Sequence, residues 1–155
     1  MSDRTRGYLL VAIQFLLLGL IFFVPSVGGF KPTAELALAG QALAWLGGLT
    51  LVVSAINLGR SLTANPVPLE QAKLKTSGLY AIVRHPIYLG LLLLAAGAIV
   101  QSGSWLHVIF GLLLFALLNY KARFEEKLLL AKFDGYRDYA KQVGRLLPCV
   151  GRLPY

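Results

Sequence analysis

Side chains that could take part in chemistry gather around an Arg-His-Pro sequence at Arg84, His85 and Pro86. Proline suits the first turn of a helix because its missing N–H would have no intrahelical partner there. It also pushes the preceding His85 out of the helical region. The backbone N–H groups of residues 87–89 are then expected at the positive end of a helix, beside the fixed charge of Arg84. This arrangement suits the binding of a carboxylate or a phosphate.

The same residues have a simpler interpretation. An arginine and a histidine before an apolar helix often serve as anchors at a membrane interface, and Tyr80 and Tyr88 are typical of the aromatic residues found there. The anchor interpretation leaves unexplained why so many polar and aromatic side chains gather around one helix start. The spacing alone leaves both interpretations open.

A second group of polar residues surrounds the adjacent Glu125 and Glu126. At about 100° per residue on a helix, Glu126 falls on an otherwise apolar face, whereas Glu125 shares a face with Lys121 and Lys132. A carboxylate on an apolar face is costly unless it meets a cation. Arg123, three residues earlier, can supply that charge, and a cationic ligand is the other choice. The helical wheel does not decide between them.

A third polar stretch covers residues 133–143. Gly135 is expected to break one helix, and Tyr136 and Tyr139 then lie one turn apart on the next. The simplest interpretation is a short amphipathic helix that lies on the membrane.

Long apolar runs must position these groups. Of the 155 residues, 57% are hydrophobic and 14% are charged, against roughly 25% charged in ordinary soluble domains. Several uncharged runs are long enough, or nearly so, to cross a bilayer. The sequence therefore predicts an all-α integral membrane protein of one domain, with four transmembrane helices and a short cytoplasmic C-terminal helix. The expected spans are 8–24, 36–58, 86–100 and 105–120, with a cytoplasmic loop at 59–85 and a cytoplasmic tail at 121–155.

The first run could instead be a secretory signal, because Arg4 and Arg6 precede it. The small residues that follow form only a poor cleavage site, and further spans come later, so an uncleaved helix is expected. The second run carries small residues that allow close contact between helices, at Gly40, Ala44, Gly47 and Gly48.

The lysines and arginines predict the orientation. Fourteen of the 15 precede the first span, lie between the second and third, or follow the fourth, and only Lys31 falls on the other side. Both termini and the 59–85 loop are therefore expected in the cytoplasm, at the inner membrane if the host is bacterial.

The net charge of the chain is +8. Because the basic residues flank the apolar runs, they predict contact with anionic lipid headgroups rather than with nucleic acid. The single cysteine, Cys149, excludes an internal disulfide, and no metal site is expected.

Taken in order, these motifs resemble the isoprenylcysteine carboxyl methyltransferase family and its phospholipid methyltransferase relatives. The shared pattern is Gly-x-Tyr, Arg-His-Pro-x-Tyr-x-Gly, a Glu-Glu pair after a helical hairpin, Gly followed by two spaced tyrosines, and a late proline. In this sequence it corresponds to Gly78 and Tyr80, to 84–90, to Glu125 and Glu126, to Gly135, Tyr136 and Tyr139, and to Pro148.

The resemblance implies that S-adenosylmethionine binds between the Arg-His-Pro helix start and the Glu-Glu helix. The residues it assigns to the cofactor are Leu74, Gly78, Tyr80, Arg84, His85, Pro86, Ile87, Tyr88, Glu125 and Glu126. It assigns the acceptor to Arg123 and Tyr120, and a catalytic role to Arg123 and Glu126. The chain departs from the eukaryotic pattern at residues 72–75, where a histidine is common, and it lacks the extra N-terminal helices, which argues against a prenylated protein as acceptor.

The predicted function is therefore methyl transfer to a carboxylate, or another nucleophile, of a small or lipophilic acceptor that reaches the site from the bilayer. An ionised acceptor needs alignment and exclusion of water rather than a strong base. An amine or a thiol would need a base, and His85 or a glutamate is the nearest choice.

Two other classes stay open. A membrane reductase family that uses a nicotinamide cofactor shares part of the C-terminal pattern. A non-enzymatic membrane scaffold or a small transporter is the other, although a transporter is expected to carry charges or helix breaks at mid-membrane.

Overall fold

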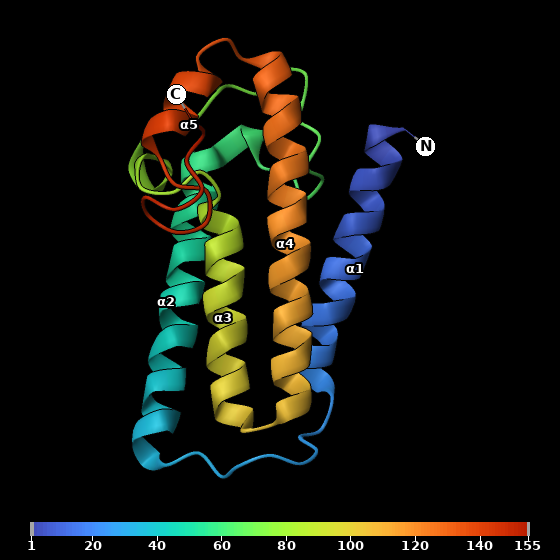
Figure 1. Cartoon of the computed structure of the whole chain (residues 1–155), viewed down its shortest axis with the longest axis vertical. Helices are drawn as coiled ribbons and strands as arrows, with labels where there is room; N and C mark the ends of the chain where they lie inside the picture. Colours follow the sequence, from blue (N-terminus) through green and yellow to red (C-terminus); the bar gives the residue numbers. More distant parts are fainter. Residues whose placement is uncertain (1, 155) are drawn as a thin grey trace.

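The chain folds as a bundle of antiparallel helices (Figure 1). The computed structural model describes residues 2–154, and within them there are five α-helices, two short 3₁₀ helices and no β-strand. The elements are α1 (Asp3–Phe23), α2 (Ala34–Leu58), η1 (Gly59–Ser61), η2 (Gly78–Ala81), α3 (Pro86–Ser102), α4 (Trp105–Lys132) and α5 (Tyr136–Gln142). This agrees with the all-α prediction.

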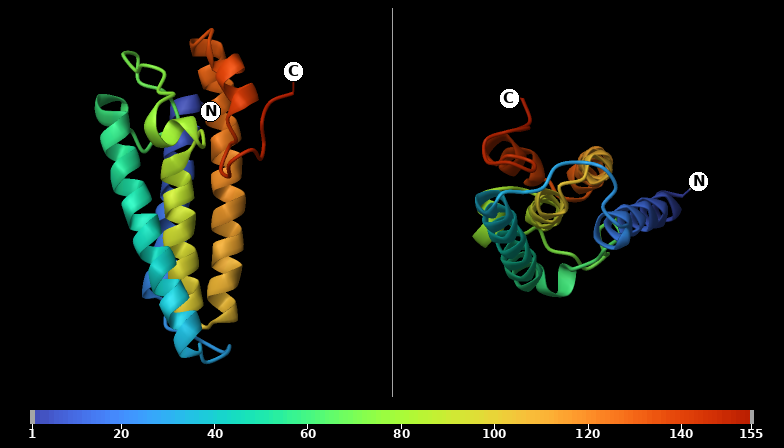
Figure 2. Two further views of the ribbon diagram at one scale, coloured as in Figure 1. Left: turned by 90° about the vertical axis from the view of Figure 1, so that its left-hand side faces the viewer. Right: turned by 90° about the horizontal axis from the view of Figure 1, so that it is seen from below.

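The helices pack in the order α2, α3, α4, α1, with α3 between α2 and α4 (Figure 2). The two ends of the chain, the loop between α2 and α3, and α5 all lie at one end of the bundle (Figure 1). We call this the polar end. The opposite end holds only the α1–α2 connection and the α3–α4 turn, so the polar motifs of the sequence meet at one place.

Short polar residues and glycines set the helix ends. Ser2 and Thr33 accept hydrogen bonds from backbone N–H groups in the first turns of α1 and α2, which stabilises a helix start. Gly103 takes the left-handed conformation that ends α3, with φ of 60°. Because Ser2 caps α1, this helix begins at Asp3, ahead of the apolar run at 8–24. The helix α4 continues without a break beyond the expected span at 105–120 and carries the two glutamates on its final turns.

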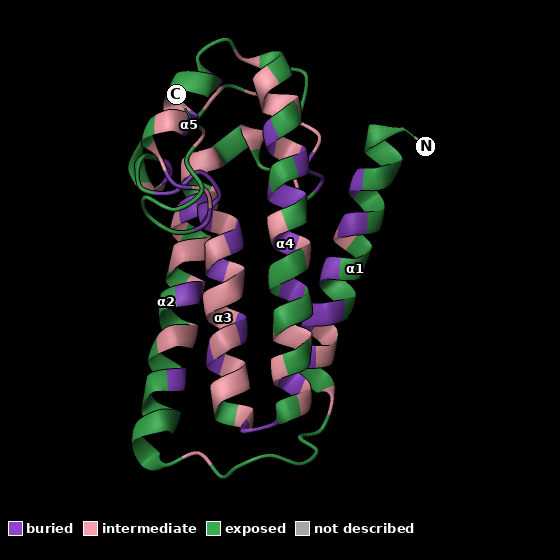
Figure 3. Ribbon diagram, in the orientation of Figure 1, coloured by how far each residue is buried: buried purple, intermediate pink, exposed green. Residues whose placement is uncertain are grey.

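Three helices are long and apolar enough to cross a membrane, namely Asp3–Phe23, Ala34–Ser61 with its 3₁₀ extension, and Trp105–Lys132. Large apolar side chains such as Leu38, Trp45 and Leu112 are exposed, and exposed positions recur along all three helices (Figure 3). The remaining apolar helix, α3, has 17 residues and is about 25 Å long at 1.5 Å per residue. That is shorter than the roughly 30 Å of a bilayer's hydrocarbon core.

Glycines bring α2 and α3 into close contact. A Cβ atom added at Gly47 would lie 2.5 Å from the backbone nitrogen of Leu94 and 2.8 Å from the carbonyl oxygen of Gly90. One added at Gly97 would lie 2.5 Å from the carbonyl oxygen of Gly40. The expectation of close packing therefore holds for Gly40 and Gly47. It fails for Gly48, which faces open space, because neighbouring residues of a helix point about 100° apart.

We expect Gly47→Ala to destabilise the protein and Gly48→Ala to leave it unchanged or slightly more stable. The added methyl at Gly47 meets backbone atoms that cannot move aside, and overpacking of this kind costs about 1–3 kcal/mol. Alanine also favours a helix over glycine by up to about 1 kcal/mol, and at Gly48 only this gain remains. Melting temperatures of the two variants in the same detergent test the contact, and equal melting temperatures would contradict it.

Candidate active site

A cavity of about 470 Å³ lies at the polar end of the bundle, within the range of 300–1,000 Å³ usual for small-molecule sites. Its walls come from every helix and from the loop between α2 and α3, and most of them are apolar. The polar residues that line it are Gln14, Ser61, Thr63, Asn65, Lys73, Lys75, Tyr80, Arg84, His85, Tyr88, Lys121, Glu125, Tyr136 and Tyr139.

The start of α3 is held in place by the C-terminal tail. His85 precedes the helix with φ of −124° and ψ of 64°, and Pro86 opens the first turn. The N–H of Arg84 donates to the carbonyl of Gly144 at 2.8 Å, and that of His85 donates to Arg145 at 3.1 Å. The Leu89 N–H bonds the carbonyl of His85, so only the N–H groups of residues 87 and 88 remain for a ligand, not the three expected.

Glu126 is the centre of a buried ion cluster. One carboxylate oxygen accepts from Arg84 Nη2 at 2.7 Å and Nε at 2.9 Å, and the other accepts from Arg145 Nε at 2.9 Å. His85 Nε2 lies 3.3 Å away. The Arg84 and Glu126 side chains are 0% and 5% exposed. Charge-assisted bonds of this kind are the strongest side-chain hydrogen bonds, so the cluster joins α4, the start of α3 and the tail.

The structure places Glu126 in this cluster and not among the residues that line the cavity. The helical wheel rightly put the carboxylate on an inward face. The cations that meet it there are Arg84 and Arg145, not Arg123. Its catalytic and cofactor-binding roles stay predictions.

Glu125, by contrast, faces the cavity. Its Oε2 accepts a hydrogen bond from the Tyr88 hydroxyl at 2.7 Å and lies 3.7 Å from His85 Nδ1. The rings of His85 and Tyr88 stack, with centroids 5.2 Å apart and planes within 3°. The helix face that Glu125 shares with Lys121 lines the cavity. Glu125 is thus the carboxylate available to a cationic ligand.

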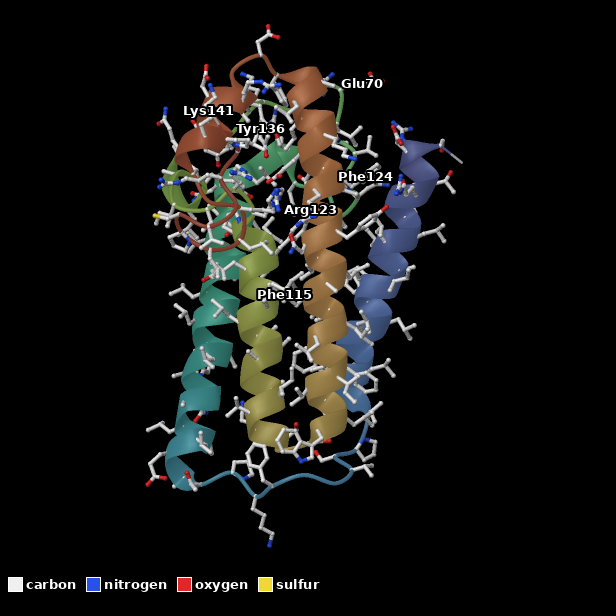
Figure 4. The ribbon with its side chains drawn as sticks, viewed as in Figure 1. Glu70, Phe115, Arg123, Phe124, Tyr136 and Lys141 are labelled. Atoms are coloured by element: carbon white, nitrogen blue, oxygen red, sulfur yellow. The ribbon has the colours of Figure 1, made fainter. Side chains whose placement is uncertain are left out.

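Three tyrosines from η2 and α5 form another wall. Burial raises the pKa of Tyr139 to about 12 and also raises the pKa of Tyr80 and Tyr136. These hydroxyls therefore stay protonated near neutral pH and can donate hydrogen bonds. The Tyr139 hydroxyl donates to the carbonyl of Tyr80. The Tyr136 hydroxyl (labelled in Figure 4) is buried in the cavity wall without a partner among the described residues. A buried hydroxyl left unpaired is costly, and a bound ligand would satisfy it.

Two of the predicted cofactor residues shape the site without reaching the cavity. Gly78 has φ of 64°, and a Cβ there would lie 2.5 Å from Asn57 Nδ2. Pro86 is fully buried at the start of α3. By contrast, the predicted cofactor residues that do line the cavity are Leu74, Tyr80, Arg84, His85, Ile87, Tyr88 and Glu125.

The two predicted acceptor residues, Arg123 and Tyr120, lie outside the cavity. Both are exposed, and on α4 they point roughly 140–160° away from Glu125 at about 100° per residue. Arg6 of α1 donates to the Tyr120 hydroxyl and lies over the ring of Phe124, which faces α1 in Figure 4. The structure therefore does not bring Arg123 and Tyr120 to the cavity, and their roles toward the acceptor stay predictions.

Sequence reasoning missed several cavity residues. Gln14 is an amide in the first apolar run, and it accepts a hydrogen bond from Lys121 Nζ at 2.7 Å. A polar side chain within a span usually has a partner on another helix, and this alone could have pointed to Gln14. Nothing in the sequence pointed to Arg145 as a partner of Glu126.

Comparison with known proteins agrees with these motifs. Residues 36–135 match the model of the phospholipid methyltransferase family. The chain belongs to this family. The match includes the start of α3 and both glutamates, and it confirms the resemblance inferred from the motifs.

Curated relatives of this phospholipid methyltransferase family member fall into two kinds. A protein-S-isoprenylcysteine O-methyltransferase of Schizosaccharomyces pombe is 34% identical over 79 residues, which are 50% of this chain and 34% of the relative. A methanethiol S-methyltransferase of Pseudomonas deceptionensis is 34% identical over 122 residues, which are 72% of this chain and 46% of the relative. Methanethiol S-methyltransferase 2 of Bradyrhizobium diazoefficiens is 37% identical over 75 residues, which are 48% of this chain and 28% of the relative. The matches cover less than half of the length of each relative.

We expect Glu126→Gln to destabilise the protein strongly. The change removes the charge between Arg84 and Arg145, and leaving a buried charge without its partner costs about 3–5 kcal/mol. Asp138→Asn is the matched control, because Asp138 pairs with Lys141 on the surface with its side chain 77% exposed, where an ion pair contributes about 1 kcal/mol or less. Thermal unfolding in detergent compares the two. A Glu126→Gln protein as stable as the Asp138→Asn protein would show that the cluster does not hold the site together.

Proposed function

We propose that this chain is an integral membrane methyltransferase that transfers the methyl group of S-adenosylmethionine to a small or lipophilic acceptor. The observation that carries the proposal is the cavity in which the start of α3, Glu125 of α4 and the tyrosines of α5 meet. Tyr88 at the start of α3 and Glu125 of α4 are 37 residues apart in the sequence and meet there through a hydrogen bond. Family membership supports methyl transfer as the chemistry.

The cavity suits this cofactor in charge and in shape. The cofactor carries a carboxylate, an ammonium and a sulfonium on a nucleoside. Glu125 is the carboxylate for a cationic group, and the N–H groups of Ile87 and Tyr88 at the positive end of α3 suit the anionic one. The unpaired Tyr136 hydroxyl offers a donor to a polar group of the ligand. When bound, the cofactor supplies a methyl group that is activated by the positive sulfur.

The residues of the chain then act by orientation and by exclusion of water. The ion cluster fixes His85 and the first turn of α3, and the tyrosine wall with the apolar lining encloses the reacting groups. Alignment of this kind can supply several kcal/mol of the barrier reduction, on the order of 7–11 in favourable cases. If the acceptor arrives with a proton, His85 Nδ1, 3.7 Å from Glu125, is the nearest base.

We further propose four membrane spans, with α3 as the shortest, and the polar end in the cytoplasm. The excess of lysine and arginine at the polar end supports this orientation. A helix of about 25 Å can span where the bilayer thins or where neighbouring helices cover its ends. The acceptor then reaches the cavity from the membrane side. The relatives, an isoprenylcysteine O-methyltransferase and a methanethiol S-methyltransferase, support a lipophilic or small molecule.

Titration of the purified protein in nanodiscs with labelled S-adenosylmethionine tests the proposal. We expect saturable binding, weakened roughly tenfold or more by Glu125→Gln and by His85→Ala, because a hydrogen bond to a charged group contributes about 1.5–3 kcal/mol. Lys127→Gln is the control, since Lys127 is exposed on the same helix. A reduced nicotinamide dinucleotide is titrated in parallel.

Two results would overturn the proposal. One is the absence of cofactor binding by a folded wild-type protein. The other is saturable binding of the nicotinamide dinucleotide in its place, which would assign the cavity to a reductase.

A further inference from the structure

Lys121 is a buried cation at the floor of the cavity. It is 1% exposed, and with Gln14 of α1 it forms part of the cavity lining. Each of the two residues lies about 16 Å along its helix from the polar end, at 1.5 Å per residue. Lys121 therefore lies one helical turn farther along α4 from the polar end than Glu125.

The ammonium of Lys121 is only partly satisfied by the protein. It has three N–H donors, and one of them meets Gln14 Oε1 at 2.7 Å. The ring of Tyr88 lies below it at 5.1 Å, a favourable but weaker contact. Glu125 is the nearest carboxylate on α4, but it accepts from the Tyr88 hydroxyl. Within residues 2–154 no carboxylate lies within 4.0 Å of the Lys121 nitrogen.

A purely structural role explains this arrangement poorly. Two neutral side chains could join α1 to α4 at that point without the cost of removing a charge from water, which amounts to several kcal/mol per ion. Ionisable residues inside membrane bundles usually face a cavity and serve function. Here Lys121 is among the residues that line the cavity, and among the described residues its ammonium makes one hydrogen bond, to Gln14.

We propose that Lys121 binds the methyl acceptor as an anion, so that the acceptor is a thiolate or a carboxylate and not an amine. This inference rests on the proposed function and names the substrate class of the same site. The lone pair of the acceptor's sulfur or oxygen forms the new bond to the methyl carbon, while the bond from that carbon to the sulfonium sulfur breaks and its electron pair stays on that sulfur. The negative charge of the acceptor cancels the positive charge of the sulfonium, and no proton is released.

The loss of the acceptor's negative charge also favours release of the methylated product. The methylated product, a thioether or an ester, is neutral and no longer bonds strongly to the ammonium of Lys121. A neutral lipophilic product favours the apolar surroundings of the bundle over this polar floor. An amine acceptor in its usual protonated form would be repelled by Lys121 at the same position.

The test uses two variants of the full-length protein in nanodiscs. Lys121→Met removes the charge. Gln14→Glu keeps the shape of the side chain but places a carboxylate beside the ammonium of Lys121. This carboxylate pairs with the ammonium, stabilises its burial and competes with an anionic acceptor. Lys127→Met, on the exposed side of the same helix, is the control. The affinity for labelled S-adenosylmethionine is measured first for every variant.

Acceptor binding is then measured from the rise in melting temperature with hexanoate, hexanethiol and hexylamine, each in the presence of the demethylated cofactor. We expect hexanoate or hexanethiol, but not hexylamine, to stabilise the wild-type and Lys127→Met proteins. In Lys121→Met and Gln14→Glu the affinity for that acceptor should fall roughly 10- to 100-fold, as for the loss of a hydrogen bond to a charged group, while cofactor affinity stays within about twofold. Labelled methyl recovered as a thioether or as an ester distinguishes the two acceptors.

The inference is wrong if both variants bind the anion as tightly as the wild type, or if hexylamine stabilises the wild-type protein more than either of the other two. If Lys121→Met fails to fold, the isosteric Gln14→Glu decides alone. A wild-type protein that binds hexanoate but not the cofactor would overturn the proposed function instead, so the two failures are distinguishable.

Discussion

The buried cluster of Arg84, Glu126 and Arg145 is the interaction on which the rest of the polar end depends. One carboxylate receives hydrogen bonds from two guanidinium groups, and each comes from a different part of the chain. Arg84 also donates to the carbonyls of Ala140 and Gly151 at 2.8 and 2.9 Å, so the same side chain holds the tail. Because these charges are buried, no conformation that separates them is favourable, and the start of α3 is fixed relative to α4.

The two adjacent glutamates, Glu125 and Glu126, therefore have different surroundings. Side chains of neighbouring residues on a helix point about 100° apart, so Glu126 turns into the cluster while Glu125 turns into the cavity. Glu126 gives rigidity, and Glu125 remains available for a ligand, held by the Tyr88 hydroxyl with His85 Nδ1 3.7 Å away. A site built in this way keeps a carboxylate oriented without neutralising it with an arginine.

The apolar part of the molecule supplies a different kind of constraint. Close glycine contacts hold α2 against α3, and α1 packs on the far side of α4. The cavity at the polar end combines apolar lining residues from the helices with polar ones, among them Gln14 and Lys121. A site of this mixed character can accommodate both polar and apolar parts of a ligand.

The sequence by itself determined the class of the protein and the residue types of its site. The apolar runs predicted the helices, Pro86 predicted the start of α3, and the ordered motifs indicated the family, since all of these depend on local composition or spacing. Only the tertiary structure decided which glutamate faces the cavity, that Arg145 and not Arg123 neutralises Glu126, and that Lys121 is buried. A helical wheel gives the angle between side chains but not which neighbour stands at each angle. The two arginine partners of Glu126 are 19 and 42 residues away in the chain, and the Gln14 partner of Lys121 is 107 residues away. Only packing brings them together.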